Sequence, residues 1–68
     1  MDNDSQQKIR ALLDYLIEHN KEHSQEVAEW AEKAQAMGAG QAGDKMLEAA
    51  RQMDKANEFL SQARKSLA

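Results

Sequence analysis

Two histidines and one glutamate lie at helical spacing in the first half of the chain. His19 and His23 are four residues apart, and Glu26 follows three residues after His23. Residues three or four apart face the same side of an α-helix, so these three side chains would share one face. Imidazole and carboxylate groups are ligands for Zn²⁺ and other divalent ions. The spacing therefore indicates a helical metal site, and a divalent metal is the one cofactor that the sequence suggests.

A structural role for His23 is an alternative to metal binding. Asn20 and His23 interrupt the apolar stripe of an otherwise regular helix. If the chain turns back near Gly40, His23 faces about position 57, which is Asn57. Asn20 then faces about position 60 or 61, which are Leu60 and Ser61. We therefore expect a buried polar layer of Asn20, His23 and Asn57, whose mutual hydrogen bonds would set the register of the helices.

The segment HNKEH also matches H-x-x-E-H, a pattern in which two histidines bind zinc and the glutamate acts as general base. Such enzymes need a further ligand and a cleft, and a thin helical chain of 68 residues offers neither. No Ser, Cys or Lys stands beside a credible base, and no Gly-rich loop follows a strand. We expect no catalytic residue and no enzyme activity.

The segment around these residues has the pattern of one long helix. Residues 8–37 contain no Gly and no Pro. Asp4 and Gln7 form a capping-box pattern, and a helix is predicted over 5–37. Its apolar residues recur at about 100° per residue within one wedge roughly 120° wide. They are Ile9, Leu13, Leu16, Val27, Trp30, Ala34 and Met37.

A turn and a second helix follow. Three clustered glycines predict a turn over 38–43, and Gly38 is placed to close the first helix. The second helix is predicted over 44–67, with a start anywhere between Gln41 and Asp44 and with Asp44 able to act as its N-cap. Its expected seam repeats at steps of four and three, the pattern of a helix that packs lengthwise against another. The seam residues are Ala42, Met46, Ala49, Met53, Ala56, Leu60, Ala63 and Leu67.

The large side chains beside these stripes are expected to fill the core. Trp30 and Phe59 sit on or next to the stripes, and buried aromatic rings contribute much of the volume of a small core. The methionines after residue 1 are expected to fill gaps between the Ala-rich helices. Tyr15 lies off the stripe, so we expect it to be exposed or at a dimer contact.

The chain is short, and its expected core is thin. Among 68 residues only ten are Leu, Ile, Val or Phe, whereas 12 are Ala. A domain of this size without Cys usually gains stability from oligomerisation or a metal. We therefore expect one all-α domain, an antiparallel two-helix hairpin that pairs into a homodimeric four-helix bundle. A three-helix monomer, in which the first helix folds back at Asn20, is the alternative.

Charge and hydropathy limit the partners. The formal net charge is −3 at pH 7 and no basic cluster is present, so no nucleic-acid surface is expected. No apolar run approaches the ~20 residues of a membrane span, and MDNDSQQ lacks the features of a secretory signal. We expect a cytoplasmic protein that binds neither membranes nor nucleic acids and that pairs with itself or another protein.

Two segments, LIEHNKEHSQEVAEWAEKA and EAARQMDKANEFLSQA, resemble a group of short, uncharacterised prokaryotic helical-hairpin domains. The shared features are an E-H-N-x-E-H segment, a Trp-Ala turn of helix and an Ala-Asn pair in the second helix. In this chain they are Glu18, His19, Asn20, Glu22, His23, Trp30, Ala31, Ala56 and Asn57. The resemblance covers most of the chain and implies the hairpin fold without supplying an activity.

Two function classes follow from these observations, and neither names a biological process. The first is a non-enzymatic interaction or scaffold module that acts as a homodimer. The alternative is a small metal-binding protein that uses the helical His/Glu site.

Overall fold

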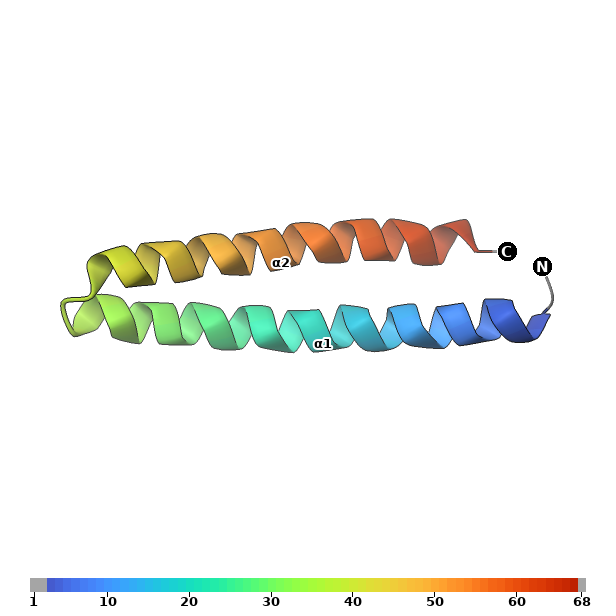
Figure 1. Cartoon of the computed structure of the whole chain (residues 1–68), viewed down its shortest axis with the longest axis horizontal. Helices are drawn as coiled ribbons and strands as arrows, with labels where there is room; N and C mark the ends of the chain where they lie inside the picture. Colours follow the sequence, from blue (N-terminus) through green and yellow to red (C-terminus); the bar gives the residue numbers. More distant parts are fainter. Residues whose placement is uncertain (1–2, 68) are drawn as a thin grey trace.

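The computed structural model describes residues 3–67, which form two antiparallel helices. Helix α1 spans Asn3–Ala36 and helix α2 spans Gly40–Ser66, and the two lie side by side along their length (Figure 1). The molecule is a rod with principal extents of 53 × 14 × 11 Å. The predicted all-α hairpin is confirmed. Because α1 continues unbroken through Asn20, the alternative three-helix monomer is wrong.

The turn is shorter than predicted and lies earlier in the chain. Residues 37–39 connect the helices, so the predicted turn over 38–43 is wrong, and the second helix starts at Gly40, before the predicted range of Gln41 to Asp44. Among the described residues, Gly38 is the one with a positive φ. The later glycines adopt ordinary helical angles, which costs only about 1 kcal/mol each relative to Ala.

Gly38 closes α1, as predicted. Its φ is +91°, a left-handed conformation that glycine adopts without steric cost. The Gly38 amide donates to the Gln35 carbonyl at 3.1 Å, and the Ala39 amide donates to the Ala34 carbonyl at 2.8 Å. These two bonds form a Schellman motif, which satisfies carbonyl groups at the helix end and reverses the chain.

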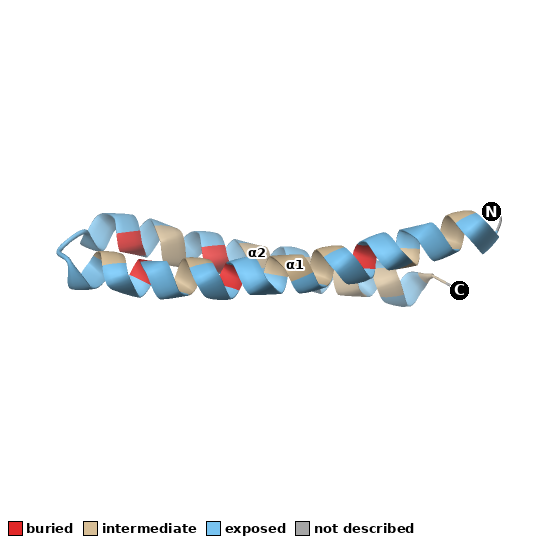
Figure 2. Cartoon of the chain, turned by 90° about the horizontal axis from the view of Figure 1, so that it is seen from below, coloured by how far each residue is buried: buried red, intermediate tan, exposed pale blue. Residues whose placement is uncertain are grey.

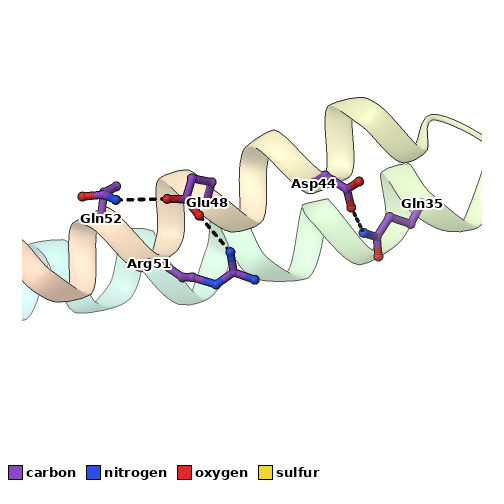
Figure 3. Close-up of polar contacts among 5 residues, drawn as sticks. All are labelled: Gln35, Asp44, Glu48, Arg51 and Gln52. Carbon is purple, nitrogen blue, oxygen red and sulfur yellow. Dashed lines mark hydrogen bonds and ion pairs between the residues drawn. The ribbon is translucent and has the colours of Figure 1, made fainter.

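Asp44 does not cap α2. The N-cap position of that helix is Ala39, which has no side-chain capping bond. Asp44 lies one turn inside the helix, where its Oδ1 accepts a hydrogen bond from Nε2 of Gln35 at 2.9 Å (Figure 3). The carboxylate therefore links the two helices near the turn.

Small residues bring the helices close together in the half of the hairpin next to the turn. A Cβ atom added to Gly43 would lie 2.9 Å from the backbone oxygen of Ala31 and 2.5 Å from Cγ of Gln35. Ala31 has no exposed surface, and Ala50 is also buried. Figure 2 shows how sparse burial is along the rod. The buried residues in the described part of the chain are Leu13, Ser24, Ala31, Gly43 and Ala50.

The buried face of α2 is rotated relative to the predicted seam. Met46, Met53, Leu60 and Leu67 are half-buried, as expected. The prediction is wrong for every second position of the seam. The alanine at each of these positions is exposed, and the residue that follows it faces α1 instead. The exposed alanines are Ala42, Ala49, Ala56 and Ala63, and the neighbours that replace them are Gly43, Ala50, Asn57 and Arg64. Gly43 permits the close approach, and Asn57 forms a bond that an alanine cannot form.

Four large apolar side chains expected in the core are exposed. Ile9 is 37% exposed, Trp30 56%, Phe59 69% and Met37 80%. A single pair of helices covers only one flank of each apolar stripe, so side chains on the other flank face solvent. Nζ of Lys33 lies 4.3 Å from the centroid of the Trp30 ring, a cation–π contact at the surface.

Candidate functional site

The two histidines form an aromatic row on the exposed flank of α1. The ring centroids of His19 and His23 are 4.4 Å apart, with an interplanar angle of 70°. Tyr15 stacks on His19 at 5.3 Å and 16°. His19 is half-buried, whereas Tyr15 and His23 are exposed. The i, i+4 spacing read from the sequence therefore does bring the two imidazoles together.

The predicted buried polar layer is wrong for His23. Its side chain is exposed, whereas Asn20 and Asn57 are half-buried. Asn57 Nδ2 donates to the backbone carbonyl of Ile17 at 2.9 Å, so Asn57 faces position 17 rather than position 23. The register differs because the turn is made by residues 37–39, which pairs each α2 residue with an earlier part of α1.

Ser24 occupies the buried polar position that the sequence analysis missed. Its hydroxyl lies 2.7 Å from Oδ1 of Asp54 and 3.2 Å from the backbone oxygen of Ala50, and it donates towards these acceptors. Ser24 is one heptad from both Ile17 and Ala31, and this spacing was the signal that could have placed it in the seam. A small hydroxyl at this position allows close helix approach and still forms a hydrogen bond across it.

Asn57 carries a buried acceptor. Its Oδ1 has no hydrogen-bond partner among the described residues, although its Nδ2 is bonded to Ile17. An unpaired polar atom removed from water costs about 1–3 kcal/mol. The side chain therefore specifies the register of the helices at some expense in stability.

Glu26 does not join the histidines in a three-ligand group. Within residues 3–67, no cluster of three or more His, Cys, Asp or Glu side chains is arranged to hold a metal ion. Each chain therefore presents two adjacent imidazole ligands, and metal binding through them stays a prediction.

One side of the hairpin carries its polar contacts between helices. Arg64 Nε donates to Oδ1 of Asp14 at 2.9 Å, and the Ser24–Asp54 and Gln35–Asp44 bonds lie towards the same side. An exposed ion pair contributes about 0–1 kcal/mol, so the Asp14–Arg64 pair orients the helices more than it stabilises them.

Glu48 lies on the solvent side of α2 within a local cluster (Figure 3). Gln52 Nε2 donates to its Oε1 at 3.0 Å, and Arg51 donates to its Oε2 at 2.8 Å. These hydrogen bonds, the one from Gln52 first, lower the pKa of the Glu48 carboxyl below its ordinary value. The cluster stabilises the ionised carboxylate on the surface of the helix.

The opposite side of the hairpin is apolar. Each helix carries a row of exposed apolar residues beside the residues that face the other helix. When each helix is viewed from its own N-terminus, this row is rotated away from the facing residues in the same direction. Because the helices are antiparallel, the two rows lie on one side of the two-helix layer. We call this the apolar side. Its apolar residues are Leu12, Trp30 and Met37 of α1 and Ala42, Ala49, Ala56 and Ala63 of α2, and His19 and His23 lie among those of α1.

The fold and this surface define a helical-hairpin domain with one apolar and one polar side. The chain belongs to the family described as Domain of unknown function (DUF8180), whose profile matches residues 9–67. No curated protein and no solved structure matched the chain. Neither helix in residues 3–67 combines the length and apolar character needed to cross a membrane.

Proposed function

We propose that the hairpin is a non-enzymatic interaction module that assembles as a homodimeric four-helix bundle through its apolar side. The observation that supports this proposal most directly is the solvent-accessible surface area of the chain. The chain exposes 5187 Å², whereas a compact monomer of 7.6 kDa would expose about 4,300 Å². The excess of about 900 Å² is close to the ~800 Å² that each partner buries in a standard protein interface.

The residues of the apolar side suit a second copy of the chain. Trp30 and Leu12 supply large apolar surface, and aromatic residues are enriched at the centres of interfaces. The exposed alanines of α2 would allow another helix to approach closely. Pairing two apolar sides would leave the side with Asp14, Arg64 and the Glu48 cluster in solvent, where charges are not desolvated.

The oligomeric state tests this proposal. Sedimentation equilibrium at micromolar concentration should give twice the mass of one chain. Trp30→Glu places a carboxylate on the apolar side and should give a monomer. Gln25→Glu adds the same charge to the opposite flank of α1 and should leave the dimer intact. A compact monomer for the unmodified chain, or a dimer that survives Trp30→Glu unchanged, would contradict the proposal.

A further inference from the structure

Besides the residues that face α2, α1 carries a row of residues at heptad spacing on its exposed flank. This row includes Leu12, Trp30 and Met37 of the apolar side. The row advances by alternating steps of four and three residues, the pattern that one helix presents to another lying along it. Its members are Leu12, Leu16, His19, His23, Glu26, Trp30, Lys33 and Met37. Large apolar residues occupy both ends of the row, and the two histidines lie in its middle.

Two residue pairs of this row are complementary when two copies of α1 lie antiparallel. With a two-fold axis at Lys21, His19 of one chain faces the partner's His23. Leu12 then faces the partner's Trp30. Position 21 is also near the midpoint of α1, so the pairing would use most of the helix. A two-fold interface is isologous, and each contact therefore occurs twice.

The ring spacing within one chain is close to that of a metal-binding pair. Two imidazoles that bind one Zn²⁺ at the tetrahedral angle through bonds of about 2.0–2.1 Å have ring centroids about 5 Å apart, which rotation of two exposed-flank side chains can reach. The centroids of His19 and His23 are 4.4 Å apart. Stacking against Tyr15 restricts the rotation of the His19 ring. Each chain thus supplies half of a tetrahedral nitrogen set.

We propose that two copies of the chain bind one divalent transition-metal ion of the Zn²⁺ type at their two-fold axis, through His19 and His23 of both chains. This inference rests on the proposed homodimer and names the ligand that its centre would hold. Four protein ligands close the coordination sphere, which is typical of structural rather than catalytic zinc. Glu26 lies one turn from His23 and would place a negative charge near the cation without binding it.

Metal stoichiometry is the first test. The chain, purified without a histidine tag, is titrated with Zn²⁺ by calorimetry and with Co²⁺ by visible absorption. We expect an end point at half an equivalent of metal per chain and the intense visible bands of tetrahedral Co²⁺. An end point at one equivalent per chain, or no binding, would overturn the inference.

Substitutions locate the site, because the chain contains only two histidines. His19→Ala and His23→Ala should each remove the half-equivalent end point and the zinc-induced rise in melting temperature. Gln25→Ala, on the opposite flank of α1, should retain both. Unchanged zinc affinity in either histidine variant would also overturn the inference.

Sedimentation with EDTA and with Zn²⁺ separates this inference from the proposed function. A dimer in EDTA that binds no zinc would overturn the shared site and leave the proposed homodimer standing. A monomer under both conditions would overturn both proposals. A dimer that binds half an equivalent of zinc and persists in EDTA would support both. A chain that is a monomer in EDTA and a dimer with half an equivalent of zinc would support the shared site and contradict a homodimer held by the apolar side alone.

Discussion

The side-chain amide of Asn57 donates a hydrogen bond to the backbone carbonyl of Ile17 at 2.9 Å, across 40 residues of sequence. Two further contacts follow at heptad spacing towards the turn, Ser24 with Ala50 and Ala31 with Gly43. Together the three pairs define the register of α1 against α2. Each combines a small or polar side chain with a backbone oxygen on the other helix, so close approach and register depend on the same positions.

Replacing Asn57 with leucine should leave the free energy of unfolding unchanged or raise it by up to about 1 kcal/mol. The variant loses one hydrogen bond, worth about 1 kcal/mol, and also removes the buried acceptor Oδ1 that has no partner. Urea unfolding of both proteins measures the difference. Asn57→Asp is the control, because a carboxylate near the Ile17 carbonyl should destabilise the fold. A loss of more than about 1 kcal/mol in Asn57→Leu would show that the amide contributes more than it costs.

Gly43→Ala should lower the free energy of unfolding by about 1–3 kcal/mol. The new methyl group would meet the backbone oxygen of Ala31 at 2.9 Å, and a backbone atom cannot move aside without shifting a helix. Thermal unfolding followed by circular dichroism measures the effect. Gly40→Ala is the matched control. No atom lies within 4 Å of a Cβ at Gly40, so that variant should be neutral or stabilising by up to about 1 kcal/mol. A stabilised Gly43→Ala variant would contradict the close packing.

Ser24 and Asp54 should be energetically coupled. Ser24→Ala removes a buried hydroxyl that lies 2.7 Å from Oδ1 of Asp54, and we expect a loss of about 1 kcal/mol. A double-mutant cycle with Asp54→Ala isolates the interaction, for which we expect about 0.5–1.5 kcal/mol. Gln25→Ala, at the exposed neighbouring position, should change stability by less than about 0.5 kcal/mol. Additive effects of the two substitutions would indicate that the hydroxyl is satisfied by Ala50 alone.

The Glu48 cluster should contribute stability that depends on pH. Because its pKa is lowered in the folded protein, the folded state favours the ionised carboxylate. This contribution is present above the ordinary pKa of glutamate and is lost as the pH falls through the lowered pKa. Carboxyl NMR titration should show the Glu48 pKa rising towards its ordinary value in Gln52→Ala. Gln62→Ala, which lies outside the cluster on the same helix, should leave that pKa unchanged. A Glu48 pKa that is the same in Gln52→Ala as in the unmodified chain would show that Arg51 and Lys55 lower it without Gln52.

The helical period, the single break in it and the special role of Gly38 could all be predicted from the sequence. These features are local. Thirty residues without Gly or Pro favour one helix, and positive φ at its end favours glycine. The adjacency of His19 and His23 is local as well, since i, i+4 spacing brings two side chains together in any α-helix. The hairpin architecture and the adjacent rings of His19 and His23 could therefore be predicted from the sequence.

The rotation and register of the two helices were decided only by tertiary packing. Ala49 and Ala50 are identical in hydropathy, so the apolar pattern alone gives no preference for which of them faces α1. The choice follows from the close contact of Gly43 with Ala31 and from the bond of Asn57 to Ile17, which need atoms distant in sequence to meet. The contacts of Ser24 and Ala31 with α2 also turn His23 outwards, because adjacent residues lie about 100° apart around an α-helix. Periodicity identifies the face of a helix only to within about one residue, and close steric contact selects the position within that range.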